Sequence, residues 1–306
     1  MTSRVAILLS GQGGQHRDMF RLLADRPEAA PIFDAASGPL GADPRIFVRD
    51  AEEAALFANR AGQILCCTQA LAGWATLSDV LPQGTILAGY SVGELAAWGC
   101  AGYLPPPEIL RLAALRAALM DRAAPDGSGL AGIAGVPPAR LDPLLARHGV
   151  ELAIDNGPDS VVVGGADVAL EACLAEALSL GARTAVRLRV AVPSHTSLLR
   201  AASTGFATAL GAVALARPAP GLRLLRGLDA ETVRDPQAGL EALAAQISRT
   251  IDWAGCLQAC CEAGATAFLE LGPGGALARM VDGLPARSLE QFRSVDGVRD
   301  WLARTP

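Results

Sequence analysis

The sequence contains no lysine, so all 26 of its basic residues are arginines. This absence excludes the phosphate-binding lysine of a P-loop, a lysine Schiff base and a serine–lysine dyad. Histidine is scarce as well, with only His16, His148 and His195 in the chain. Because imidazole is the commonest metal ligand, this scarcity leaves little from which to build a metal site, and we expect none.

Cysteine gives no paired motif. The seven cysteines include no C-x-x-C pair, although Cys256 and Cys260 lie one helical turn apart. No histidine lies near these two, so burial in the core is a better interpretation of them than a metal site. An odd number of scattered thiols favours a reducing compartment, and we expect a cytoplasmic protein.

Charge and hydropathy exclude two classes of partner. The formal net charge of −5 argues against nucleic acid, because a phosphate backbone is bound by basic surfaces. No uninterrupted apolar run reaches the roughly 18 residues of a membrane-spanning helix. The apolar residues 4–9 are too few for a secretory leader and are better read as a buried strand. We therefore expect no nucleic acid, membrane or leader.

The order of apolar segments predicts an α/β protein with an inserted unit. Strands and helices alternate in the first part, which is typical of a parallel sheet covered by helices: we expect strands at 4–9 and 85–89, and helices at 17–26, 63–78, 94–101 and 107–122. After a turn cluster at 124–129 the order becomes β-α-β-β-α-β, a ferredoxin-like unit, with strands at 130–135, 151–155, 160–164 and 183–190 and helices at 138–148 and 167–180. Helices at 197–213, 239–248 and 253–263 and a strand at 266–271 complete the larger part.

The pentapeptide Gly89-Tyr90-Ser91-Val92-Gly93 has the G-x-S-x-G pattern of a nucleophile elbow. Small residues are needed two positions before and after such a serine, because side chains there would collide with the neighbouring strand and helix. The following helix would aim its N-terminal N–H groups at an oxyanion on the substrate. An ordinary glycine-rich turn remains the alternative for this pentapeptide taken alone.

Two further segments support a serine mechanism. His195 follows Val192-Pro193-Ser194 at the start of a loop, and among three histidines it is the best candidate for the base of Ser91. The segment Gly11–Gln15 follows the first strand but fails as a dinucleotide fingerprint, because His16 stands at the third glycine position. We interpret it as a loop that supplies a backbone N–H to an oxyanion.

Taken together, these segments resemble one family. From residue 4 to about 280 the chain is similar to malonyl-CoA:acyl carrier protein transacylases, in seven motifs that occur in the family's order. The seven motifs are GQGGQ at 11–15, GYSVGE at 89–94, Arg116 with Met120 four residues later, DGSG at 126–129, NGP at 156–158 with VVVGG at 161–165, PSH at 193–195 and ELGPG at 270–274. The single residue Gln246 also matches, between the last two motifs.

The resemblance implies a fold and a set of roles. It implies an α/β-hydrolase-like large domain at 1–124 and 197–306, a ferredoxin-like small domain at 125–196, and an active site in the cleft between them. Ser91 would be the nucleophile and His195 its base, a Ser-His dyad in which the main-chain carbonyl of Gln246 replaces the usual carboxylate. The amides of Gln12 and Val92 would form the oxyanion hole.

The resemblance also implies a substrate. Arg116 would bind the free carboxylate of a malonyl group, and Gln63 would line the active-site cleft. The chemistry agrees, because a planar guanidinium can bind a carboxylate through two hydrogen bonds. A solvated arginine on the helix at 107–122, which also carries Arg111 and Arg122, is the alternative.

Tyr90 stands where most of the family has histidine, and TyrSerValGlyGlu at 90–94 resembles the acyltransferase subunit of malonate decarboxylase. That resemblance implies transfer of malonyl from malonyl-CoA to the thiol of a small carrier subunit, with no permanently bound cofactor. A transacylase of fatty-acid or polyketide synthesis, acting on a phosphopantetheine carrier, is the main alternative. A serine thioesterase and a non-catalytic scaffold that binds the carrier are two others.

Overall fold

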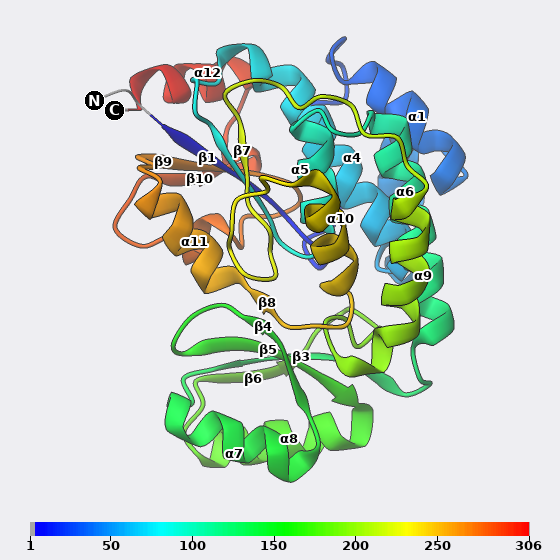
Figure 1. The fold of residues 1–306 in the computed structure, drawn as a ribbon, viewed down its shortest axis with the longest axis vertical. Coiled ribbons are helices and arrows are strands. Elements are labelled where there is room, and N and C mark those ends of the chain that lie inside the picture. The colour runs from blue at the N-terminus through cyan, green and yellow to red at the C-terminus, as the bar shows by residue number, and fades with distance from the viewer. Residues whose placement is uncertain (1–3, 306) are drawn as a thin grey trace.

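The computed structural model describes residues 4–305, which contain two β-sheets (Figure 1). The larger sheet is parallel, with strand order β10-β9-β1-β2-β7. Its strands are β1 Val5–Leu9, β2 Ile86–Gly89, β7 Arg223–Leu224, β9 Ala267–Leu271 and β10 Ala286–Ser288. The strands predicted at 4–9, 85–89 and 266–271 are confirmed, and they lie next to one another in the middle of this sheet.

The central strand β1 explains why the sheet is covered on both faces. All five of its residues are fully buried. Alternate side chains of a strand point to opposite faces, and accordingly Val5, Ile7 and Leu9 belong to one apolar core while Ala6 and Leu8 belong to another. A strand that is apolar throughout is typical of a parallel sheet between two layers.

Helices cover both faces of the larger sheet. The helices predicted at 63–78, 94–101, 107–122, 239–248 and 253–263 are confirmed to within a few residues, and most of the segment predicted at 197–213 is helical. In this part of the chain the helices are α1 Ala30–Leu40, α2 Pro44–Asp50, α3 Glu53–Leu56, α4 Asn59–Leu77, α5 Val92–Cys100, α6 Pro106–Ala123, α9 Arg200–Gly211, α10 Pro236–Ala245, α11 Trp253–Glu262 and α12 Val295–Arg304. Figure 1 shows α4, α6 and α9 together on one side of the molecule and α11 on the other.

The helix predicted at 17–26 is wrong. This segment forms a series of turns, and the first helix begins only at Ala30. Several of its backbone bonds join residues three apart, as from the Arg21 N–H to the Asp18 carbonyl. Met19 and Leu23 are buried in this conformation. Tertiary burial of these side chains has outweighed local helix propensity.

The smaller sheet has the predicted β-α-β-β-α-β order. Its elements are β3 Ser128–Ala134, α7 Pro138–His148, β4 Glu151–Asp155, β5 Ser160–Ala166, α8 Asp167–Ser179 and β6 Thr184–Arg187. The strand order β6-β3-β5-β4-β8 puts the first and third strands in the middle. One face packs against α7 and α8, and the other contributes Leu130 and Val162 to a core shared with the larger sheet.

Two details differ from the prediction for this unit. The strand expected at 183–190 is shorter, because β6 ends at Arg187. The fifth strand, β8 Ile251–Asp252, pairs in parallel with β4 although it lies outside 125–196. The division into domains at 1–124, 125–196 and 197–306 stays a prediction. The pairing of β8 with β4 joins the segment 125–196 to the segment 197–306.

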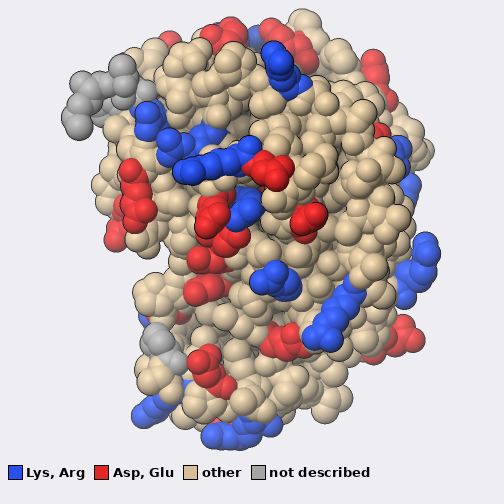
Figure 2. All heavy atoms as spheres, in the orientation of Figure 1, with Lys and Arg blue, Asp and Glu red and all other residues tan. Residues whose placement is uncertain are grey.

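The face of the molecule in Figure 2 has no single dominant charge. Figure 2 shows acidic and basic side chains interspersed over the face drawn there, without a large area of one sign. Across residues 4–305, no helix combines the length and the apolar character that crossing a membrane requires.

Candidate active site

Ser91 sits on a strained turn between β2 and α5. Its backbone dihedrals are φ 57° and ψ −120°, which place it in a conformation that residues with a side chain seldom adopt. The two flanking glycines make the turn possible. A Cβ on Gly89 would lie 2.2 Å from the Glu94 Cα, and one on Gly93 would lie 2.0 Å from the Leu9 carbonyl oxygen. The steric reason for the G-x-S-x-G pattern therefore holds in this structure.

Gly93→Ala should destabilise the protein by about 3 kcal/mol or more, because the new methyl group meets backbone that cannot rotate away. Gly211→Ala is a matched control, since a Cβ on this glycine at the end of α9 meets no atom of another segment within 4 Å. That change should be neutral or stabilising by about 0.5–1 kcal/mol. Urea unfolding of the two variants measures the difference, and equal midpoints would contradict the steric argument.

His195 lies directly against Ser91. The Ser91 Oγ and the His195 Nε2 are 2.8 Å apart, and the His195 Nδ1 contacts the main-chain carbonyl oxygen of Gln246. The backbone N–H of His195 also donates to the Ile247 carbonyl, at 2.8 Å. An Nδ1–H that donates to a carbonyl leaves Nε2 free to accept the serine proton. The structure thus brings together Ser91, His195 and Gln246, the three residues that the family resemblance assigned to the dyad and its support.

The surroundings of His195 keep its ring neutral. Its side chain is buried, and this burial, with the nearby Arg116 charge, lowers the pKa of His195 to about 3, although the Gln246 carbonyl acts in the opposite direction. The ring can therefore act as a proton acceptor at neutral pH. The other two histidines are engaged elsewhere, His16 with Glu290 and His148 with Glu176.

The glycine-rich loop after β1 lies beside the nucleophile. A Cβ on Gly11 would approach the Tyr90 carbonyl to 2.9 Å, so the loop and the elbow touch through their backbones. Within residues 4–305 the backbone N–H groups of Gln12 and Val92 make no hydrogen bond to protein. Both amides are thus available as donors, which is what an oxyanion hole requires.

Arg116 is a fully buried cation on α6. Its Nη1 donates to the Gln63 Oε1 at 2.8 Å, whereas its Nε and Nη2 have no partner among the described residues. Nε and Nη2 form one edge of the guanidinium, the edge that binds a carboxylate side-on. Burial lowers the pKa of Arg116 to about 10, so the group stays charged at neutral pH.

The amide of Gln63 is fixed from its other end. Its Nε2 donates to the Asn59 Oδ1 at 2.8 Å and lies 3.4 Å from the Met120 Sδ. Asn59 is held in turn by the Asp121 carboxylate, at 2.7 Å. Gln63 therefore presents its carbonyl oxygen, and not its amide nitrogen, to Arg116.

A cavity of about 490 Å³ opens at the dyad. Its lining includes Ser91, His195 and Gln12 from the larger sheet and its loops, together with Leu130, Asn156 and Val162 from the smaller sheet and its loops. Gln63, Val92, Arg116 and Gln246 are each fully buried in the structure. The cavity thus lies between the two units, and these four residues are not part of its lining.

Two groups of polar residues were not singled out from the sequence. Glu94, within the elbow motif, is buried and accepts hydrogen bonds from Gln246 and Gly227. Burial raises the pKa of this carboxyl to about 7, against the opposing effect of those two donors.

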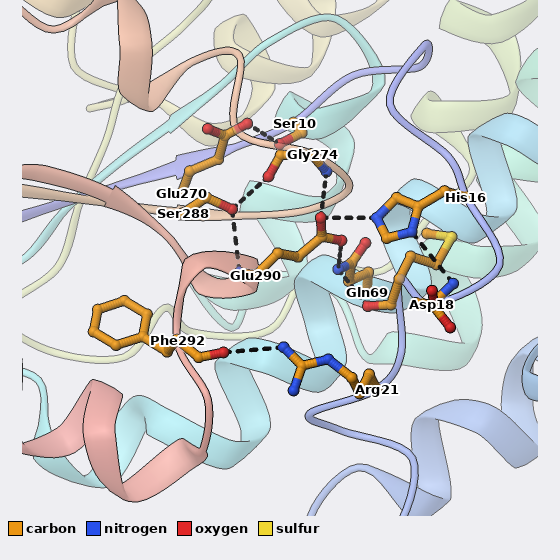
Figure 3. Close-up of polar contacts among 11 residues, drawn as sticks. Ser10, His16, Asp18, Arg21, Gln69, Glu270, Gly274, Ser288, Glu290 and Phe292 are labelled. Carbon is orange, nitrogen blue, oxygen red and sulfur yellow. Dashed lines mark hydrogen bonds and ion pairs between the residues drawn. The ribbon is translucent and has the colours of Figure 1, made fainter.

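The second group lies near the glycine-rich loop. Glu290 contacts His16, Gln69 and the Gly274 amide, and Figure 3 shows these groups turned toward one another. Their partners lie far apart in sequence, so no local pattern could have revealed either group.

Metal ligands do not gather at this site. No cluster of three or more His, Cys, Asp or Glu side chains that could hold a metal ion occurs in the part of the chain that the structure describes. The groups beside Ser91 are instead a neutral base and two backbone donors, and the buried cation of Arg116 is near enough to His195 to lower its pKa. This arrangement can perform acyl transfer through a serine ester.

Comparison with known proteins gives one consistent family. The family model for the acyl transferase domain matches residues 7–291. The malonyl CoA-acyl carrier protein transacylase of Haemophilus influenzae is 29% identical, with 98% of this chain and 99% of that protein covered. The solved malonyl-CoA:acyl carrier protein transacylase of Xanthomonas oryzae pv. oryzae is 30% identical with a TM-score of 0.88, covering 99% of this chain and 98% of the other. A malonyl-transacylase solved in complex with its type II polyketide acyl-carrier protein is 26% identical, also with a TM-score of 0.88, covering 99% of both chains.

Proposed function

The chain belongs to the acyl transferase domain family, among the malonyl CoA-acyl carrier protein transacylases, and on this premise we propose that it moves malonyl from malonyl-CoA to the thiol of an acyl carrier protein. The observation that carries the proposal is the pairing of an activated serine with a buried, half-paired arginine. Ser91 contacts His195, and Arg116 has one edge of its guanidinium without a protein partner among residues 4–305. A malonyl thioester has both groups that such a site needs, a carbonyl to attack and a carboxylate to bind.

The reaction proceeds by two transfers through Ser91. In the first, the Ser91 Oγ attacks the thioester carbon as its proton passes to the His195 Nε2, and the amides of Gln12 and Val92 stabilise the oxyanion. The carbon–sulfur bond breaks, and the histidine returns the proton to the CoA thiolate. In the second, a carrier thiol gives its proton to His195 and attacks the malonyl ester, and Ser91 recovers its proton.

The partner of His195 bears on the choice between transfer and hydrolysis. No carboxylate bonds to the His195 ring among residues 4–305, and its Nδ1 meets the Gln246 carbonyl instead. A neutral carbonyl stabilises an imidazolium less than a carboxylate does. We infer that this weaker base favours attack by a thiol over attack by water, which supports a transferase over a serine thioesterase.

A malonate decarboxylase subunit remains a second candidate, because of Tyr90. This residue lines the cavity, and its ring packs edge-on against Trp253 with 5.2 Å between centroids. The relatives described above are transacylases, which favours a phosphopantetheine carrier over the decarboxylase carrier.

A cytoplasmic location belongs to the same proposal, since all seven cysteines are free thiols.

The choice of carrier can be measured directly. With malonyl-CoA as donor, kcat/KM for a phosphopantetheine acyl carrier protein should exceed that for a malonate decarboxylase carrier by at least about tenfold, which corresponds to roughly 1.4 kcal/mol of transition-state binding. Tyr90→His is the informative variant, and it should leave this preference unchanged. If kcat/KM is higher with the decarboxylase carrier, and Tyr90→His reverses this preference, the protein is better described as a malonate decarboxylase subunit.

A further inference from the structure

A buried carboxylate lies in the first turn of α5, the helix that follows the nucleophile. Glu94 stands three residues after Ser91 in the first turn of α5, and only 1% of its surface is exposed. Its position at a helix N-terminus favours a negative charge. The proposed mechanism gives this residue no role. A buried carboxylate is costly unless it is hydrogen-bonded or paired, and the Glu94 Oε1 has no partner among the described residues.

Glu94 bonds to the residue that orients the base. Its Oε2 accepts from the Gln246 Nε2 and from the Gly227 N–H, each at 2.9 Å. The same Gln246 Nε2 lies 3.2 Å from the Ser91 carbonyl oxygen. The side chain of Gln246 is thus held at the base of the elbow, while its main-chain carbonyl meets the His195 Nδ1.

The end of α10 explains why this carbonyl needs support. Gln246 caps that helix at its C-terminus, where carbonyl groups have no partner within the helix. The Gln246 carbonyl is therefore free to accept from His195, but the helix alone does not fix its direction. A bond from its side chain to α5 ties it to the element that carries Ser91.

We propose that Glu94 is a positioning residue, which holds the Gln246 side chain so that the Gln246 carbonyl keeps His195 aligned with Ser91. The contacts form a closed circuit from Ser91 through His195 and Gln246 back to the backbone of Ser91. Glu94 anchors this circuit through its Oε2, which accepts from both the Gln246 Nε2 and the Gly227 N–H. The inference rests on the proposed use of Ser91 as nucleophile.

A double-mutant cycle tests the proposal. Glu94→Ala removes the anchor, Glu94→Gln keeps an oxygen that can accept from Gln246, and Gln246→Ala removes the side-chain amide but keeps the main-chain carbonyl. The readout is the rate at which a fluorophosphonate labels Ser91, where the Ser91 Oγ attacks phosphorus, its proton passes to His195 and fluoride leaves. This probe carries no malonyl group, so it reports the dyad separately from the proposed substrate.

Glu94→Ala and Gln246→Ala should each slow labelling by about tenfold to a hundredfold through the maximal rate, with half-saturation by the probe unchanged. Glu94→Gln should recover much of the loss. When Glu94→Ala is added to Gln246→Ala, labelling should slow by no more than about another twofold relative to Gln246→Ala alone, because both changes break the same connection. Glu176→Gln, which alters a carboxylate bound to Arg147 and His148 in the smaller unit, should react like the unaltered protein.

Multiplied effects in the double variant would overturn the proposal, because Glu94 would then act independently of Gln246. A Gln246→Ala variant that labels at the full rate would overturn it as well, and this holds even if Glu94→Ala does not fold. The same variants are also assayed with malonyl-CoA. Failure of the unaltered protein to accept malonyl, with the labelling cycle intact, would reject the proposed function and leave the positioning role standing.

Discussion

Ser91→Ala is expected to abolish malonyl transfer, with a fall in kcat of about 10⁴-fold or more, because the acyl group then has no oxygen to which it can be attached. The unaltered protein incubated with malonyl-CoA should gain one malonyl group on the peptide that contains Ser91. In the Ser91→Ala variant that peptide should remain unlabelled. Mass spectrometry of the digested protein gives both results.

The base can be included in the same experiment. His195→Ala should lower kcat by a similar factor, and the double variant should be no slower than either single variant, because nucleophile and base act as a unit. Ser37→Ala is a suitable control, since this serine donates to the Phe33 carbonyl in α1, away from the dyad. Malonyl found on a cysteine instead of Ser91 would refute the serine mechanism.

Arg116→Ala should lower kcat/KM for malonyl-CoA by at least about tenfold to a hundredfold, the factor that corresponds to a charge-assisted hydrogen bond of roughly 1.5–3 kcal/mol. Acetyl-CoA carries no carboxylate, so its slow transfer should stay level or improve once the buried cation is gone. The comparison uses one protein and two substrates. General damage to the fold would lower both rates together.

Two variants sharpen this test. Arg116→Lys should rescue malonyl transfer only in part, because an ammonium cannot reproduce a two-pronged contact. Arg111→Ala is the matched control on the same helix, since the Arg111 side chain is 53% exposed and pairs with Glu108, and it should leave both rates unchanged. A parallel fall for malonyl and acetyl in Arg116→Ala would show that Arg116 is structural, and the malonyl assignment would lose its main physical support.

The elbow could be predicted because its requirements are local. Gly89, Ser91 and Gly93 are neighbours in the chain, and the steric conflict that demands glycine arises within one strand-to-helix turn. His195 could be predicted for a different reason, since a chain with three histidines offers few candidates for a base. In both cases the residue type itself carried the signal.

Gln246 and Glu94 had no such signal. Gln246 contributes a main-chain carbonyl, which every residue has, so only the resemblance to a family indicated its position. Glu94 lies inside a motif that the sequence made obvious, yet its partners Gly227 and Gln246 are 133 and 152 residues away along the chain. Contacts of that separation leave no periodic pattern.

The α/β order, the inserted β-α-β-β-α-β unit and the elbow could be predicted from the sequence, because propensity, alternation and turn geometry act between near neighbours. The choice of His195 came from the scarcity of histidine in the chain. The tertiary structure alone decided which charged groups are buried. Arg111 and Arg116 lie on one helix, but Arg111 is exposed whereas Arg116 is fully buried and bonds to Gln63. It also decided that residues 17–26 form turns, in which Met19 and Leu23 are buried in the core. Burial depends on which distant segments pack together, and that is a property of the folded chain as a whole.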